Sequence, residues 1–394
     1  MSGFALFNLK YPSLLQFDKD RVDSVEAHNL KALFYIDHIP SDTSLRERLD
    51  QLSPDKIRPL FTQLFSLAQR NKVLESYTYL DEGYLVSIDG TGYFSSHDVH
   101  CENCCEKNHK DGSKTYYHQM LCSVLVHPER SHVIPFCPEP IQKQDGTNKN
   151  DCERNAAKRL LKDLKREHPH LKLVIIEDGL ASNAPHIRLL QELEYKYILG
   201  AKPDDHKWLF NWVKSAACNE YEYTDDKGCL HQFKYVNDAP LNESNQDVRV
   251  NFLEYWETKP HKKTQHFTWV TDILITDDNA MKLMRGGRTR WKVENETINT
   301  LKNQGYEFEH NFGHGDKHLS HVFALLMMLA FMVDELQFIA CGLMKLAKET
   351  MKGKKRLWRK MRSAFDSYYI MSWSDLLSLL AYGLQKPTLA PDTS

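Results

Sequence analysis

The sequence predicts an α/β fold: a mixed β-sheet with helices on both faces, interrupted by a β-rich insertion and flanked by helical N- and C-terminal regions. Between residues 84 and 199, apolar runs of strand length alternate with amphipathic helical stretches. Residues 206–280 instead hold strand-like runs separated by Gly, Asn and Pro. The chain has 394 residues, of which 41% are hydrophobic and 26% charged, so we expect a folded protein of two or three modules.

The central elements follow the order strand, strand, strand, helix, strand, helix, strand. Their expected ranges are 84–89, 119–127, 132–136, 151–167, 172–177, 184–193 and 195–199. This is the order of an RNase-H-like core, in which acidic residues on adjacent strands can meet. We therefore assign the parts of the chain as follows: helical N-terminal region 1–83, core 84–205, insertion 206–280, final core helix 281–315 and helical C-terminal region 316–394.

The insertion is expected to open with a β-hairpin. The segment Tyr221–Thr224 is strand-like, Asp225–Gly228 has turn composition, and a second strand-like run follows. Further strands are expected at 248–256 and 266–275.

The N-terminal region reads as short helices. Helix-start signals occur at 41–44 and 53–55, the second with a Pro at the first helical position. Leu60, Leu64 and Leu67 then recur at helical spacing. This region is either a small helical domain that packs on the rest or a domain that binds DNA ends.

The C-terminal region is expected to begin with a long apolar helix over about 316–347. Its longest apolar run, 322–333, is too short to span a bilayer and fits a buried helix. Residues 352–362 then hold seven basic residues and no acid. Such a run is either a solvated helix face or a phosphate-binding surface, and four of its side chains are candidate DNA contacts: Lys354, Lys355, Arg356 and Arg359.

Three acidic residues stand out by their settings. Asp89 and Asp178 each follow an apolar strand-like run and precede a Gly, and Glu294 lies in a helical stretch. Two carboxylates at strand ends and a third on a helix can hold a pair of Mg²⁺ or Mn²⁺ ions, an arrangement that suits phosphoryl transfer on nucleic acid. Each Asp-Gly pair alone is also typical of an ordinary turn.

Arg290 lies four residues before Glu294, so the two side chains share a helix face. An arginine there can contact a DNA phosphate while the glutamate reaches a metal ion. The alternative is a surface ion pair, which contributes only a few tenths of a kcal/mol. Glu296 is a second candidate for the third carboxylate.

The segments around Asp89, Asp178 and 290–295 resemble the DDE transposases of bacterial insertion sequences. The likeness spans about 84–321 and includes the runs 145–156 and 202–206. The similar group has a β-strand insertion before the final Glu and a Tyr, Arg, Glu, Lys helix signature. Its Arg and Glu fall on Arg290 and Glu294, its Tyr position falls on Gly287, and its Lys position falls one residue before Lys302.

The resemblance implies a metal-dependent enzyme. It would cleave a strand at a transposon end, and the freed 3′-hydroxyl would then attack the opposite strand or target DNA. Transposon-end DNA, target DNA and a second copy in a synaptic homodimer are the implied partners. The family also implies an aromatic side chain that holds a flipped base, for which Trp269 and Trp256 are candidates by stacking. Strand tryptophans are otherwise core residues.

A cysteine cluster is the second concentrated feature. Cys101 and Cys104 have zinc-ligand spacing, and His109 and His118 follow. A structural Zn²⁺ would pin the loop between two predicted strands. The alternatives are reduced free thiols or a redox-sensitive site. A metal role for the histidines near 314–321 is less favoured than capping or flanking the long helix.

The remaining bulk properties place the protein in broad terms. The formal net charge of −2 argues neither for nor against nucleic acid. With nine cysteines and no secretion-signal pattern in the first residues, we expect a reducing cytosol and no membrane contact. The resemblance implies a bacterial cytoplasm and association with the nucleoid. A metal-dependent nuclease of the same fold and a DNA-binding transposase relative that does not cut are the alternative functions.

Overall fold

The computed structural model describes residues 1–81, 83–141 and 153–383. The chain divides into two compact units. We call Met1–Leu60, Ser96–Asn103 and Asn299–Ser394 the terminal unit, and Phe61–Ser95 and Cys104–Ile298 the sheet unit. The N- and C-terminal regions, separate in the sequence-based assignment, therefore belong to one compact unit.

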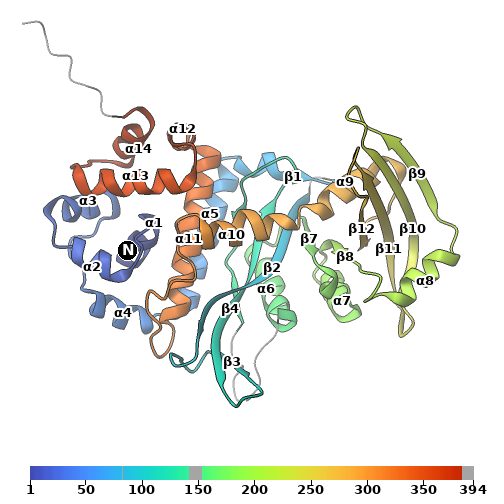
Figure 1. Ribbon diagram of the computed structural model, residues 1–394, viewed down its shortest axis with the longest axis horizontal. Helices are drawn as coiled ribbons and strands as arrows, with labels where there is room; N and C mark the ends of the chain where they lie inside the picture. The colour runs from blue at the N-terminus through green and yellow to red at the C-terminus, as the bar shows by residue number, and fades with distance from the viewer. Residues whose placement is uncertain (82, 142–152, 384–394) are drawn as a thin grey trace, which may run out of the picture. The chain divides into compact units, whose positions relative to one another are not determined.

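The sheet unit is built on one mixed sheet with the strand order β3-β4-β2-β7-β8-β12-β11-β10-β9 (Figure 1). These strands are β2 (Gly83–Ser96), β3 (Cys105–Asn108), β4 (Lys114–Val126), β7 (Leu173–Glu177), β8 (Lys196–Gly200), β9 (Asn219–Thr224), β10 (Leu230–Asn242), β11 (Asn245–Thr258) and β12 (Gln265–Thr271). Three short strands pair at its side: β1 (Thr78–Tyr79), β5 (Ile134–Pro135) and β6 (Glu139–Ile141). The predicted α/β class with a mixed sheet is confirmed.

The centre of the sheet is parallel. β2 runs parallel to β7, with Ser87 opposite Ile176, and β7 runs parallel to β8. All five residues of β7 are buried, as expected for a strand covered on both faces. The strands therefore form where the sequence has continuous apolar runs rather than alternating ones.

Strand β2 extends further than the sequence predicts. It continues through Asp89 and Gly90 to Ser96 because β4 pairs with it on the side away from β7. The Asp89-Gly90 pair is therefore extended strand and not a turn. Asp178, in contrast, directly follows the last residue of β7, as predicted.

The insertion extends the core sheet. β12 pairs antiparallel with β8, placing Trp269 opposite Gly200, and β11, β10 and β9 follow in antiparallel order. The predicted hairpin at 225–228 is present, with Leu230 opposite Thr224. One helix, α8 (Lys207–Ser215), opens this part of the chain, which was expected to be β-rich throughout.

Helices cover both faces of the central sheet. They include α6 (Glu153–Glu167), α7 (Ala184–Glu192) and α9 (Asp277–Arg288). Leu85 of β2 contacts Gly286 in α9, whereas a Cβ on Gly90 of the same strand would meet Glu153 in α6. Because alternate residues of a strand face opposite sides, α6 and α9 lie on opposite faces. The described part of the predicted 151–167 helix is confirmed; residues 151 and 152, and most of the run 145–156, lie outside the described residues.

Helix α5 (Arg58–Arg70) buries a different side from the one the leucine spacing suggests. Leu60 and Leu67 are exposed, while Phe61, Phe65 and Ala68 are buried. Phe65 stacks on Phe136, with 4.8 Å between ring centroids. The aromatic stripe buries more apolar area than the leucines would, and this decides the helix orientation.

The terminal unit is helical. Its N-terminal helices are α1 (Ser2–Asn8), α2 (Leu14–Asp20), α3 (Ser24–Phe34) and α4 (Asp42–Asp50), and its C-terminal helices are α10 (Asn299–Asn303), α11 (Leu319–Ala340), α12 (Gly342–Met351), α13 (Lys354–Ser367) and α14 (Trp373–Tyr382). The predicted cap at Ser41 is present: its hydroxyl accepts a hydrogen bond from the Ser44 amide, at 3.4 Å. The Ser53-Pro54 signal starts a single 3₁₀ turn, Pro54–Lys56, before α5.

The long apolar helix expected over 316–347 is divided at Cys341, where the backbone is extended, into α11 and α12. By length and composition α11 is apolar enough to cross a membrane, but 78% of its most apolar window is buried inside the protein. Such burial is typical of the core helix of a soluble protein.

Candidate active site

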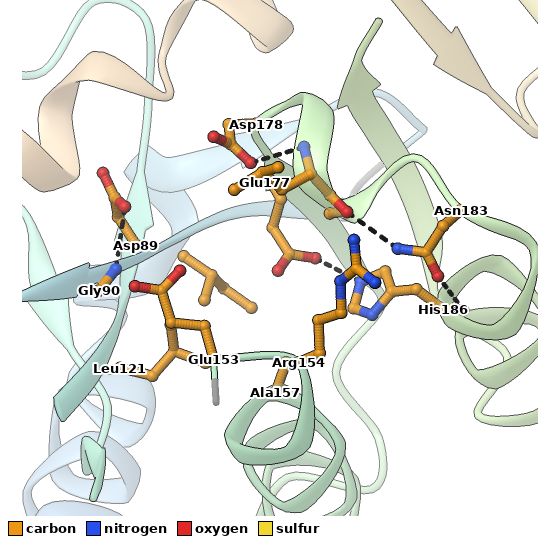
Figure 2. Close-up of a pocket in the computed structure, with 13 residues that line it drawn as sticks. Asp89, Gly90, Leu121, Glu153, Arg154, Ala157, Glu177, Asp178, Asn183 and His186 are labelled. Atoms are coloured by element: carbon orange, nitrogen blue, oxygen red, sulfur yellow. Dashed lines mark hydrogen bonds and ion pairs between the residues drawn. The ribbon is translucent and has the colours of Figure 1, made fainter. Parts of the chain in front are cut away.

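Asp89 and Asp178 occupy matching positions on neighbouring parallel strands. Each lies two residues beyond the paired residues Ser87 and Ile176. Both line one cavity of about 480 Å³ between β2, β7 and α6 (Figure 2). The prediction that these two carboxylates meet at one edge of the sheet agrees with this geometry.

Glu294 lies next to Asp89 because of Arg290. The Arg290 guanidinium is 3.2 Å from Asp89 Oδ2 and 3.2 Å from Glu294 Oε1. Ser87 and Asp89 face the same side of β2, and the Ser87 hydroxyl donates to the Arg290 carbonyl, at 3.1 Å. The strand and the turn that carries Arg290 are thereby held together.

The segment that carries Glu294 is a π-helix, Val293–Ile298. Such widened turns are frequently found at functional sites. The buried Lys292 anchors this segment: its ammonium donates to the carbonyls of His127, Pro128 and Arg130. Glu294 itself is exposed and faces solvent beside Asp89.

The protonation of Asp89 is unusual. Burial raises the pKa of Asp89 to about 6; the Arg290 charge opposes this effect, and Glu294 adds to it. Asp89 therefore carries a proton at a pH where an exposed aspartate does not. Such a raised pKa is typical of clustered carboxylates at functional sites.

Two further carboxylates line the same cavity and were not among the sequence-based candidates. The side chains of Glu153 and Glu177 point into it (Figure 2). Burial raises the pKa of Glu153, and the charges of Asp178 and Glu177 raise it further. Glu177 and His186 form a buried ion pair at 2.6 Å. Burial lowers the pKa of His186, but Glu177 outweighs this effect and the net shift is upward.

The sequence carried one signal for each of these residues: Glu177 directly precedes Asp178, and Glu153 begins the amphipathic helix α6. Unlike Asp89 and Asp178, neither glutamate lies between an apolar strand-like run and a Gly. Only the packing of α6 beside β2 shows that Glu153 belongs to the cavity.

A second cavity, of about 440 Å³, lies on the other side of Asp178. Both cavities are bordered by Glu177 and Asp178. Its lining is basic and aromatic, in contrast to the acidic first cavity, and includes Lys202, Trp269, Arg288, Arg290 and Trp291. Trp291 is 44% exposed, whereas Trp269 is only 6% exposed. Trp269 packs so closely on Gly287 that a Cβ there would lie 2.5 Å from its indole nitrogen.

The close contact with Trp269 explains why residue 287 is a glycine. A side chain at residue 287 would collide with the Trp269 ring. Trp269 also stacks on Phe267, with 5.9 Å between centroids. Trp256, the other candidate for base stacking, is half-buried and stacks on His266 at 5.1 Å.

The remaining candidate DNA contacts lie in the terminal unit. Lys302 is engaged by Glu309 at 2.7 Å. In α13, Lys355, Arg356 and Arg359 are exposed, but the Lys354 side chain is only 11% exposed and pairs with Glu335 at 2.9 Å. Trp358 of the same run is buried. The basic run is therefore an amphipathic helix whose exposed cations alternate with core residues.

A Cys/His group that can bind a metal ion is present. Cys104 and His118 both belong to the sheet unit and contribute to this group. The sulfur of Cys104 is 3.4 Å from Nε2 of His118. His109, another member of the predicted set, is hydrogen-bonded to the Thr115 hydroxyl at 2.7 Å. His109 lies at the β3–β4 turn, where strand pairing directs it to Thr115.

Among the described residues, Asp89, Asp178 and Glu294 do not form a group of this kind, with all ligand atoms within 4.8 Å. Arg290 instead holds two of them. Neither a comparison with protein-family models nor one with curated proteins finds a match for this chain.

Proposed function

We propose that this protein is a metal-dependent DNA strand-transfer enzyme of the DDE transposase type, with an RNase-H-like core. The observation that carries the proposal is the matched placement of Asp89 and Asp178 on adjacent parallel strands, with Glu294 brought to Asp89 by Arg290. Three carboxylates presented by two strands and a helix supply the hard oxygen ligands that Mg²⁺ or Mn²⁺ prefers. The resemblance of these segments to insertion-sequence transposases supports the same function.

The donor set fits divalent metal ions in chemistry. Asp89, Asp178 and Glu294 would hold them, and the ions would stabilise the attacking and leaving oxygens of a phosphodiester displacement. Without metal, the Arg290 guanidinium balances the charges of Asp89 and Glu294. A cation at these carboxylates competes with Arg290, which would leave its guanidinium available to a DNA phosphate.

The second cavity supports a nucleic-acid substrate. Lys202, Arg288 and Arg290 place positive charge next to Asp178, and Trp291 adds an exposed aromatic ring. The phosphates of a nucleic-acid strand would pair with the cations of this cavity. The strand would then lie next to the acidic site that borders it. A small neutral substrate would not require this basic lining.

The proposal is tested by cleavage and joining of DNA that carries the terminal repeats flanking the coding sequence. We expect Mg²⁺- or Mn²⁺-dependent cleavage and joined product from the wild type, and a loss of about 100-fold or more for Asp178→Asn and Glu294→Gln. Asp178→Asn keeps the oxygen that accepts the Leu180 amide at 2.9 Å, so the local fold should persist.

The matched control is Glu192→Gln, which removes an exposed carboxylate at the end of α7. It should cleave and join at the wild-type rate. Cleavage without joined product would favour a metal-dependent nuclease of the same fold. Tight binding with no cleavage in either metal would favour the non-catalytic DNA-binding relative. Full activity in both carboxylate variants would rule out the site.

We also propose that Cys101 and Cys104 bind a structural Zn²⁺ together with His118 and a second histidine, because the Cys104 sulfur lies 3.4 Å from Nε2 of His118. Two thiolates and two imidazoles form a common ligand set of structural zinc sites. By elemental analysis, protein purified without chelators should hold one zinc equivalent less in Cys101→Ser and in Cys104→Ser than in the wild type, whereas the control Cys341→Ser should keep the wild-type content. If the Cys101→Ser and Cys104→Ser proteins hold as much zinc as the wild type, the assignment is wrong.

A further inference from the structure

The turn between β9 and β10 places three metal-binding residue types on one face of a hairpin. Asp225 precedes the turn, Cys229 follows it, and His231 lies two residues further along β10. Their ligand atoms all lie within 4.8 Å of one another. Residues two apart on a strand share a face, so Cys229 and His231 point the same way. We propose that Asp225, Cys229 and His231 form a Zn²⁺ site in the insertion.

The turn geometry directs Asp225 toward the other two residues. One oxygen, Oδ1, accepts the amides of Lys227 and Cys229 at 2.9 Å each. The other, Oδ2, lies 3.4 Å from Nε2 of His231. The turn itself closes through Gly228, whose φ of +74° suits glycine. One oxygen therefore holds the turn, while the second faces the proposed ion.

His231 is oriented by a neighbour. Its Nδ1 is 2.7 Å from the Tyr255 hydroxyl, and its ring stacks on Tyr223 with 4.8 Å between centroids. When Nδ1 donates its proton to Tyr255, Nε2 presents a lone pair toward Asp225, as metal ligation requires. A partner of this kind behind the ligating histidine is typical of zinc sites.

The surrounding charges favour a cation. Burial raises the pKa of the Cys229 thiol, and Glu257 and Asp225 raise it further. The nearby cations Lys259 and Arg288 are both engaged by Glu257, at 3.2 Å each. A zinc ion would take the place of the thiol proton and lie beside the Asp225 carboxylate. A thiolate, an imidazole and a carboxylate suit zinc, with water as the fourth ligand. The ion would clamp the β9–β10 turn.

The test measures zinc by titration and elemental analysis in full-length protein carrying Cys101→Ser and Cys104→Ser, so that the other cysteine group does not contribute. We expect one zinc equivalent in this background. Cys229→Ser should lose it, and Asp225→Asn should weaken binding by about tenfold or more. Asp225→Asn keeps the amide-accepting oxygen, so it separates metal binding from turn formation.

The matched control is Cys218→Ser. Cys218 directly precedes β9 and belongs to neither group. It should bind zinc like the background protein. Equal zinc content in the Cys229→Ser and Cys218→Ser proteins would overturn the proposal, as would a background protein that holds no zinc while retaining the wild-type circular dichroism spectrum. Neither outcome depends on DNA cleavage, so the result is independent of the proposed enzymatic function.

Discussion

Replacing Asp89 by asparagine is expected to abolish DNA cleavage while leaving the folded protein more stable above pH 6. The carboxylate would be a ligand of the metal ions, so its loss should slow cleavage by about 1,000-fold, or about 4 kcal/mol of transition-state stabilisation. The same carboxylate is costly in the metal-free protein, because burial raises its pKa to about 6. The substitution removes the free-energy cost of ionising a buried carboxyl but also removes its ion pair with Arg290. The balance should raise the free energy of unfolding by about 1–2 kcal/mol.

The pH dependence of this gain follows from the direction of the shift. The pKa of Asp89 lies above the ordinary value of 3.8, so the cost of ionising it is absent below about pH 4 and fully present above about pH 6. Chemical denaturation of both proteins at pH 4 and pH 8, without metal, measures the difference. Asp247→Asn, an exposed aspartate paired with Arg188 in the same unit, is the control and should leave cleavage unchanged. A variant that loses stability at pH 8 would show that Asp89 is a structural residue.

Replacing Lys10 by methionine is expected to destabilise the terminal unit by about 3–5 kcal/mol. Lys10 is 2% exposed, and its ammonium lies 2.6 Å from the buried Asp334. It also lies over the rings of Tyr306 and Trp358, at 4.6 and 4.3 Å from their centroids. Burial lowers the pKa of Lys10 and raises that of Asp334, in each case against the opposing effect of the pair. Methionine keeps the volume but leaves Asp334 without its counter-charge.

Denaturant unfolding of the full chain measures this loss, and Lys19→Met, on the exposed side of α2, is the matched control. Adding Asp334→Asn to Lys10→Met should recover part of the stability, because the buried carboxylate left without a counter-charge is then removed and the asparagine can still accept from the Tyr306 hydroxyl. A single variant within about 0.5 kcal/mol of the wild type would show that the pair contributes little.

From the sequence, the candidate site could be predicted only at acidic residues that directly follow an apolar, strand-like run. Asp178 follows a fully buried strand, and this pattern is readable because buried parallel strands are continuous apolar runs. Asp89 was found for the same reason, although its strand does not end there. Strand β2 continues past Asp89 because β4 pairs with it on the side away from β7. This pairing uses backbone hydrogen bonds, so the side chains around Asp89 do not reveal it. Glu153 and His186 were missed because helix packing alone brings them to the cavity.

By itself, the sequence determined the class of the fold, the order of the central strands and helices, the turn at 225–228 and the acidic residues that follow or lie near the central strands. These features depend on hydrophobic periodicity and on turn composition, which are local. The tertiary structure alone decided that the insertion continues the core sheet through β12 and β8, and that the N- and C-terminal regions share one unit. These outcomes depend on contacts between residues far apart in the chain, whose partners no local pattern specifies.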